Sequence, residues 1–223
     1  GLNRSSPVDA SIIATAVPIF VLLLAAVILK EPITRKKSFG VFMGVSGGLL
    51  LVFSSTQSAD SVSSLDGDVM MIISGLMYAI YLVLSKPLSL RYSSVTMMKW
   101  MFLFTTLALV PFTFRHVLDA PAFHREVWDF TELSAIFYVL FGATFLPYLL
   151  IPMSLKRIRP TTVSMYNYVQ PIVASLIAVM IGQDTFSWQK FLSAILVFTG
   201  VYLVTQSKSR ADLEKEKHNK SVL

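Results

Sequence analysis

The residues of this sequence that could do chemistry are amides and hydroxyls placed inside long apolar runs. Asn167 and Gln170 stand one helical turn apart, with Tyr166 beside them and Pro171 directly after them. An amide in apolar surroundings needs a hydrogen-bond partner, which a polar solute can supply. Pro171 also lacks the N–H that would bond the carbonyl of Asn167, and Pro18 interrupts an earlier run in the same way. Paired helix breaks of this kind predict a solute-binding site, with hydrogen bonding between helices as the alternative.

A second group of hydroxyls lies along one face of an earlier run. Ser74, Tyr78, Tyr81 and Ser85 are spaced i, i+4, i+7 and i+11, which places them on a single helical stripe. Hydroxyls are poorly accommodated by lipid tails, so the stripe should face protein or a water-filled cavity. Lining of a cavity and bonding to neighbouring helices both remain open. Tyr148, in a later run, is a further candidate for a cavity wall.

The sequence lacks the residues that metal centres, cofactor sites and catalytic clusters require. It has no Cys, and His116, His124 and His218 are not paired at metal-ligand spacing. No Asp, Glu or His lies near the middle of an apolar run, and no phosphate-binding glycine loop is present. We therefore expect no metal, no cofactor and no enzymatic activity. Proton coupling through a buried acid also has no support in these runs.

The elements that hold these residues are expected to be membrane helices. Hydrophobic residues make up 54% of the 223 residues and charged residues only 14%, against about 25% charged residues in an ordinary soluble domain. So few polar side chains cannot cover a soluble protein, which excludes a soluble enzyme and a disordered chain. The net charge of +6 comes in short bursts between apolar runs, so nucleic acid is not an expected partner.

Seven apolar runs approach the roughly 20 residues that a helix needs to cross a bilayer. They are Val8–Leu29, Phe39–Ser54, Val69–Ser85, Val95–Phe114, Leu133–Leu155, Thr161–Ile181 and Phe186–Thr205. Strands of a membrane barrel would be about ten residues long and would alternate apolar with polar residues. The predicted fold class is therefore an all-α integral membrane protein with seven transmembrane helices.

Positive charge indicates which side of the membrane each loop occupies. Fifteen of the 19 Lys and Arg residues fall in alternate loops and in the charged tail 207–223, and four fall on the other side. The positive-inside rule places the richer side, and with it the C-terminus, in the cytoplasm. We expect a multi-pass protein of the plasma membrane, such as the bacterial inner membrane. Its expected partners are lipid and a small-molecule substrate, and a homodimer stays open.

The sequence repeats itself at an offset of 153 residues. Ten of the 46 residue pairs that start at 7–52 are identical, and the shared residues include prolines, a serine, a lysine and a glycine. Glu31 is matched by Asp184, and Lys37 is matched by Lys190. The offset spans five predicted helices, an odd number, so the two copies cross the membrane in opposite directions. Inverted repeats of this kind are typical of many secondary transporters.

An inverted repeat of five helices predicts ten helices in the intact protein. Residues 1–54 then hold the last two helices of the first repeat, 55–66 form a linker, and 67–206 hold the five helices of the second repeat. Three helices are expected ahead of Gly1, which is not an initiator Met. The small residues Gly40 and Gly44 are expected to let two helices approach closely.

The order and spacing of these residues resemble a known family. The closing helix pair of an EamA domain, the domain that defines the drug/metabolite transporter superfamily, is similar to the pattern Pro7…Ser11…Pro18…Glu31…Gly40…Gly47. The segments 67–84 and 164–171 resemble the first and fourth helices of the second such domain. Asp184 stands where the family usually has Glu, and Ser193 stands opposite Gly40 in the repeat. The resemblance implies ten helices around a central cavity and transport of amino acids, other metabolites, drugs or nucleotide sugars by alternating access.

Two other kinds of membrane protein compete with this interpretation. A seven-helix receptor would have the same orientation but no repeat at 153 residues. A seven-helix sugar carrier has parallel three-helix repeats, which would not span five helices. The sequence therefore favours a membrane transporter of small metabolites. Its expected substrate-binding residues are Asn167, Gln170, Tyr78, Tyr81, Ser74, Tyr148 and Tyr166, next to the helix breaks at Pro18 and Pro171.

Overall fold

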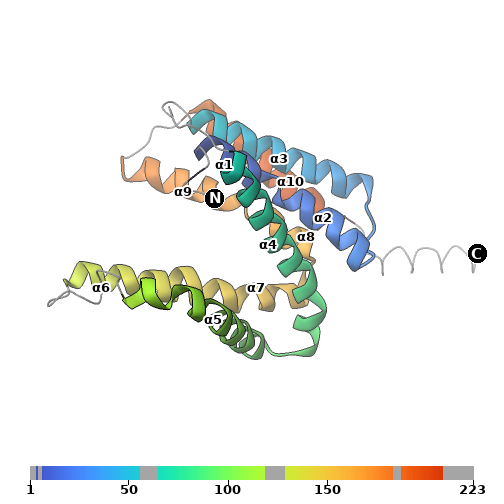
Figure 1. Cartoon of the computed structure of the whole chain (residues 1–223). Coiled ribbons are helices and arrows are strands. Elements are labelled where there is room, and N and C mark those ends of the chain that lie inside the picture. Colours follow the sequence, from blue (N-terminus) through green and yellow to red (C-terminus); the bar gives the residue numbers. More distant parts are fainter. Residues whose placement is uncertain (1–3, 5–6, 56–64, 119–128, 183–186, 208–223) are drawn as a thin grey trace, which may run out of the picture. The chain divides into compact units, whose positions relative to one another are not determined.

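The computed structural model describes residue 4 and residues 7–55, 65–118, 129–182 and 187–207, which are helical apart from short connections (Figure 1). The helices are α1 (Pro7–Thr15), α2 (Val17–Ile28), α3 (Arg35–Ser55), α4 (Leu65–Arg91), α5 (Ser94–Leu118), α6 (Phe130–Phe137), the π-helix η2 (Tyr138–Phe145), α7 (Leu146–Arg157), α8 (Pro160–Tyr166), α9 (Val169–Met180) and α10 (Trp188–Thr205). No strand occurs within these ranges. The predicted all-α class is confirmed.

Six helical segments of the described chain are long and apolar enough to cross a membrane. They are Ala10–Ile28, Arg35–Phe53, Leu65–Arg91, Ser94–Phe114, Phe130–Arg157 and Trp188–Thr205. The predicted run Thr161–Ile181 is not among them, because a turn at Asn167 and Tyr168 divides it into α8 and α9, of 7 and 12 residues. The structure therefore differs from seven uninterrupted helices at this run, although its residues are helical on both sides of the turn.

The chain forms two compact units. The first contains residues 1–84 and 158–223, and the second contains residues 85–157. Helix α4 begins in the first unit and ends in the second. The first unit therefore holds α1–α3, most of α4 and α8–α10, while the second holds the end of α4 with α5, α6, η2 and α7.

The centre of the first unit is the packing of α3 against α10, which lie side by side in Figure 1. A Cβ on Gly200 would lie only 2.6 Å from the carbonyl oxygen of Gly40, so both residues must be glycine for the backbones to come this close. A Cβ on Gly47 would meet Val197 at 2.8 Å. Residue numbers rise along α3 as they fall along α10, so the helices run antiparallel. The predicted close approach of the glycine face is confirmed.

Helix boundaries in the first unit follow the 153-residue offset of the sequence. Helix α1 begins at Pro7 and α8 begins at Pro160, while α3 begins at Arg35 and α10 begins at Trp188. Helices α2 and α9 correspond in the same way to within one residue. The helix breaks between α1 and α2 and between α8 and α9 therefore fall at equivalent places in the two halves of the sequence.

The second unit consists of an α5–α7 pair extended by α6 and η2. Along η2 the helix widens, and the hydroxyl of Thr144 donates to the carbonyl of Val139, five residues earlier, at 2.8 Å. Pro147 follows closely, and its missing N–H would leave a regular α-helix one hydrogen bond short. Most apolar side chains of α5, α6 and η2 are exposed within the described chain. Surfaces of this kind require lipid or further protein to cover them.

Candidate functional site

The two helix breaks of the first unit open onto one cavity of about 450 Å³. Residues from the α1–α2 break, α3, α4 and the α8–α9 break contribute to its wall. The lining residues are Ser11, Ala14, Thr15, Val17, Gly48, Leu51, Val52, Tyr78, Asn167, Tyr168, Gln170 and Pro171. Among the described residues, the lining contains no acid, no Lys or Arg and no His. Its hydrogen-bonding groups are hydroxyls, amides and backbone, set among apolar side chains, which is the usual make-up of a small-molecule site.

Proline explains why the backbone breaks at this cavity. Pro18 near the start of α2 and Pro171 near the start of α9 lack the N–H groups that would bond the carbonyls of Ala14 and Asn167. Both breaks are tightened by short-range bonds instead, from the N–H of Ala16 to Ile13 at 3.0 Å and from the N–H of Asn167 to Ser164 at 3.2 Å. The structure has a helix break beside each of the two prolines, and both breaks border the same cavity.

The structure brings together some of the predicted binding residues. Asn167 and Gln170 from the α8–α9 break and Tyr78 from α4 all line the cavity. The ring of Tyr81 lies 6.1 Å from that of Tyr78, centroid to centroid, but Tyr81 is not a lining residue.

The other predicted residues lie elsewhere. Ser74 and Tyr166 are exposed and are not part of the cavity lining. Tyr148 belongs to the second unit, where its ring packs 5.3 Å from that of Phe102.

Tyr168 is a lining residue that was not among the predicted binding residues. Its ring fills the space above Gly44 and Gly48, where an added Cβ would lie 3.1 and 3.2 Å from ring carbons. Its buried hydroxyl donates to the carbonyl of Thr15, a residue 153 positions earlier. Tyr168 and Thr15 are thus partners in the sequence repeat as well as in space. The repeat alignment pairs them, so it could have drawn attention to both.

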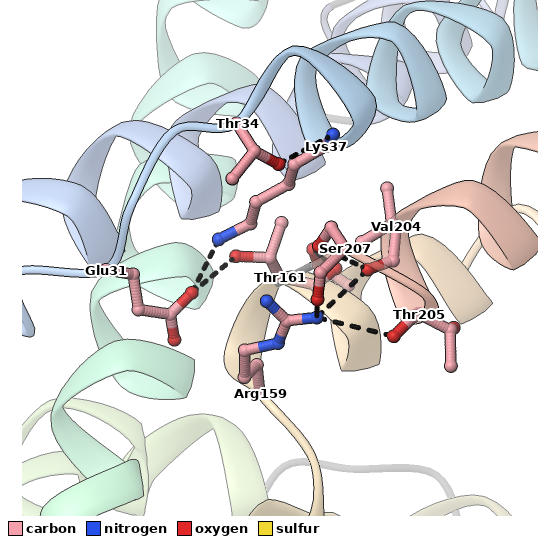
Figure 2. Close-up of polar contacts among 9 residues, drawn as sticks. Glu31, Thr34, Lys37, Arg159, Thr161, Val204, Thr205 and Ser207 are labelled. Carbon is pink, nitrogen blue, oxygen red and sulfur yellow. Dashed lines mark hydrogen bonds and ion pairs between the residues drawn. The ribbon is translucent and has the colours of Figure 1, made fainter. Parts of the chain in front are cut away.

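A second polar cluster ties three segments of the first unit together (Figure 2). Lys37, which is fully buried, donates from Nζ to the Glu31 carboxylate at 2.5 Å. The hydroxyl of Thr161 at the start of α8 donates to the same oxygen at 3.4 Å. The cluster therefore joins the α2–α3 connection to α8 through a charged group that apolar surroundings would otherwise destabilise.

Arg159 extends this cluster to the end of α10. Its Nη2 donates to the carbonyl oxygens of Val204 at 3.0 Å and Ser207 at 2.9 Å (Figure 2). These carbonyls lie at the C-terminal end of the helix, where the backbone has partial negative charge and orphan acceptors. The sequence placed Lys37 and Arg159 among the charges of the positively charged side and gave no sign of the polar cluster that they join. The pairing of Glu31 and Lys37 recurs as Asp184 and Lys190 in the repeat, but Asp184 lies outside the described residues.

No group of three His, Cys, Asp or Glu that could hold a metal ion occurs within the described ranges. Two of the three histidines, His124 and His218, lie outside those ranges.

Comparison with known proteins decides the family. Residues 1–53 and 65–206 match the EamA-like transporter family, which leaves only the linker and the tail unmatched. The chain belongs to the EamA-like transporter family. The chain is similar to an uncharacterized transporter of Archaeoglobus fulgidus, with 27% identity over 205 residues. It is also similar to the uncharacterized transporter YetK of Bacillus subtilis, with 21% identity over 213 residues. The alignments cover 92% and 95% of this chain but 68% and 64% of those proteins.

Two further comparisons bear on function and fold. A probable amino-acid metabolite efflux pump of Salmonella typhimurium is 23% identical over 201 residues, covering 87% of this chain and 66% of that protein. A solved crystal structure matches with a TM-score of 0.75 at 19% identity, over 92% of this chain and 69% of that one. The chain thus spans about two thirds of the length of these proteins. The family consists of membrane transporters, so the predictions of transport and of no enzymatic activity are confirmed, and the receptor and the sugar carrier find no support.

Proposed function

We propose that the protein moves a small polar solute across the membrane by alternating access and binds that solute in the 450 Å³ cavity. Asn167 and Gln170 bond the solute, and Tyr78 forms part of the facing wall. The observation that carries the proposal is the meeting of two proline helix breaks and two amides at one uncharged cavity. Discontinuous helices expose backbone carbonyls and N–H groups, which is how many transporters form a site within the membrane.

The proposed architecture is an inverted repeat of two five-helix units. Its support is the agreement of helix boundaries at the 153-residue offset, together with the antiparallel contact of the equivalent helices α3 and α10. The contact is also two-fold symmetric, because the repeat relates one end of it to the other. Gly40 approaches Gly200, and the residues that the repeat pairs with them, Ser193 and Gly47, are also in contact. There the Ser193 hydroxyl donates to the Gly47 carbonyl at 2.5 Å. Residues 1–54 then complete a first repeat, 55–66 form the linker and 67–206 form the second repeat.

The proposed location and substrate class follow from charge and from a relative. Most Lys and Arg residues fall on one side, and this bias supports the proposal that this side and the tail 207–223 face the cytoplasm of a cell such as a bacterium. An amino acid or a related metabolite is the substrate class we propose, since the Salmonella relative is named as a probable amino-acid metabolite efflux pump. A homodimer stays a prediction.

In this mechanism the ion-pair cluster would hold the helices that it connects in a fixed arrangement. Glu31, Lys37, Thr161 and Arg159 connect the α2–α3 connection, α8 and the end of α10, all within the first unit. We propose that these helices move as one body during transport. The buried charge pair favours one packing arrangement of these helices, because a shift in register would leave Lys37 without its partner.

The proposal is tested by removing the two amides one at a time. Asn167→Ala or Gln170→Ala deletes a group that bonds the solute, at a cost of about 1–3 kcal/mol, or roughly 5- to 150-fold in affinity. Uptake of a panel of radiolabelled amino acids into proteoliposomes containing the full-length protein should show this loss, while the thermal unfolding midpoint stays near that of the wild type.

The matched control is Gln189→Ala, which removes the same amide from an exposed position on α10. It should transport as the wild type does. Wild-type transport by both cavity variants would place the binding site elsewhere.

A further inference from the structure

The second unit carries a hollow of about 610 Å³ that is separate from the proposed solute site. The start of α5 and the end of α7 form it, so the two helices lie antiparallel there. Ser94 and Val95 contribute from α5, and Leu149, Met153, Lys156 and Arg157 contribute from the α7 side. One end of the hollow is therefore cationic and its remaining wall is mainly apolar.

The cationic end is suited to an anion in three respects. Lys156 and Arg157 are exposed, and neither makes an ion pair within the described chain. No Asp or Glu is among the described residues that line the hollow. The first turn of the 25-residue helix α5 lies at the same place, with Ser93 capping it by accepting from the N–H of Thr96 at 3.1 Å. The positive end of the helix dipole thus adds to the two cations.

Ser94 provides an independent sign that a ligand belongs here. It lines the hollow and is only 6% exposed, yet its hydroxyl has no hydrogen-bond partner among the described residues. A buried hydroxyl normally finds a partner, because leaving it unbonded costs free energy. The geometry is also held in place: Lys86 at the end of α4 donates to the carbonyl of Leu155, which fixes the end of α7 beside this unit's part of α4.

We propose that this hollow binds the phosphate of an anionic phospholipid, with the headgroup at Lys156, Arg157 and Ser94 and an acyl chain along Val95, Leu149 and Met153. The apolar wall distinguishes a lipid from a free anion, since a soluble phosphate would gain nothing from it. The loops at this end belong to the positively charged side of the protein, and the cytoplasmic leaflet is the one that carries anionic lipid. The site is independent of the proposed transport mechanism.

The test is lipid binding by the purified full-length protein in detergent, measured by native mass spectrometry and by the thermal unfolding midpoint. Phosphatidylglycerol should bind and raise the midpoint, whereas phosphatidylcholine and soluble glycerol phosphate should not. Each cation near an anionic lipid contributes about 5-fold in affinity, so K156Q/R157Q should weaken phosphatidylglycerol binding by about 25-fold. The matched control R35Q/K36Q removes two exposed charges from the start of α3, on the same positively charged side, and should leave binding unchanged.

Ser94→Ala separates a built site from general surface charge. Without lipid the variant should be as stable as the wild type or slightly more stable, because the hydroxyl has no partner to lose. Phosphatidylglycerol should raise the thermal unfolding midpoint of this variant less than that of the wild type, because its affinity for the lipid is lowered by about 5-fold. The proposal is overturned if K156Q/R157Q weakens binding no more than R35Q/K36Q does, if Ser94→Ala responds to lipid as the wild type does, or if glycerol phosphate stabilises as well as phosphatidylglycerol. None of these results depends on whether the protein transports.

Discussion

Burial of the Lys37 ammonium is energetically costly, and yet this side chain is fully buried while that of its neighbour Lys36 is exposed. The ammonium is retained because Glu31 lies 2.5 Å away and shares its carboxylate with Thr161. Charge pairs of this kind contribute little by themselves, but removing one partner leaves the other charge without compensation.

Lys37→Met should therefore destabilise the protein by about 3 kcal/mol, near the lower end of the range for a broken buried pair, since Glu31 remains 11% exposed. The thermal unfolding midpoint in detergent measures this loss. The double variant E31Q/K37M should recover much of the stability because no charge is then left alone. Lys36→Met is the control and should change little. Equal midpoints for Lys37→Met and Lys36→Met would show that the buried pair has no such role.

Individual residues were predicted from the sequence only where their chemistry was unusual for its surroundings. Asn167 and Gln170 were found because amides are rare in apolar runs, and both line the cavity. Lys37 was missed because a lysine near a helix start is normally solvated in the headgroup region. Tyr168 was not among the predicted binding residues, because only the fold shows that Gly44 and Gly48 leave room for its ring.

At the scale of helices, the contact of α3 with α10 depends on the absence of side chains at Gly40 and Gly200. Gly200→Ala would place its Cβ 2.6 Å from the Gly40 carbonyl oxygen and 2.7 Å from the Gly44 nitrogen, both of which are backbone atoms. Backbone cannot move aside as a flexible side chain can, so the helices must separate. We expect a loss of about 1–3 kcal/mol in unfolding free energy, the usual cost of overpacking.

Gly142→Ala in the π-helix η2 is the matched control for this variant. Its Cβ would lie 3.4 Å from the Tyr138 ring, an ordinary contact. It should be tolerated or slightly stabilising, as the better helix propensity of Ala suggests. Chemical unfolding of both variants in detergent makes the comparison. A tolerated Gly200→Ala would mean that α3 and α10 do not pack this closely.

The helices could be predicted from the length of the apolar runs, and their breaks from the positions of proline. The π-helical form of the backbone along η2 could not be predicted. The run 8–29 became α1 and α2, and the run 161–181 became α8 and α9, each divided close to its proline. The π-helix η2 has no comparable signature, because Thr144 and Pro147 are compatible with an ordinary kinked helix as well. The 153-residue offset was the most informative pattern, since the starts of the paired helices agree along it to within one residue.

For the molecule as a whole, the described chain is two units of different character. The first has a packed core that includes Leu22, Val41, Met165, Val197 and Val204. The second exposes most of its apolar side chains, as a membrane protein does toward lipid or toward further helices. The chain covers about two thirds of its relatives' length. Sequence alone could not supply this contrast, because apolar runs facing protein and apolar runs facing lipid have similar composition.

The central claim is that the solute binds between the two helix breaks of the first unit. The measurement that tests it most directly is solute protection of an introduced cysteine, for which this chain offers a clean background because it has no native Cys. Ala14→Cys lies on the cavity wall and is exposed, while Gln189→Cys is exposed on α10 away from the cavity. A small thiol reagent should label both in the full-length protein, and the transported amino acid should slow labelling at position 14 in proportion to its binding, with no effect at position 189. Labelling at position 14 that a saturating concentration of the transported solute leaves unchanged would contradict the account.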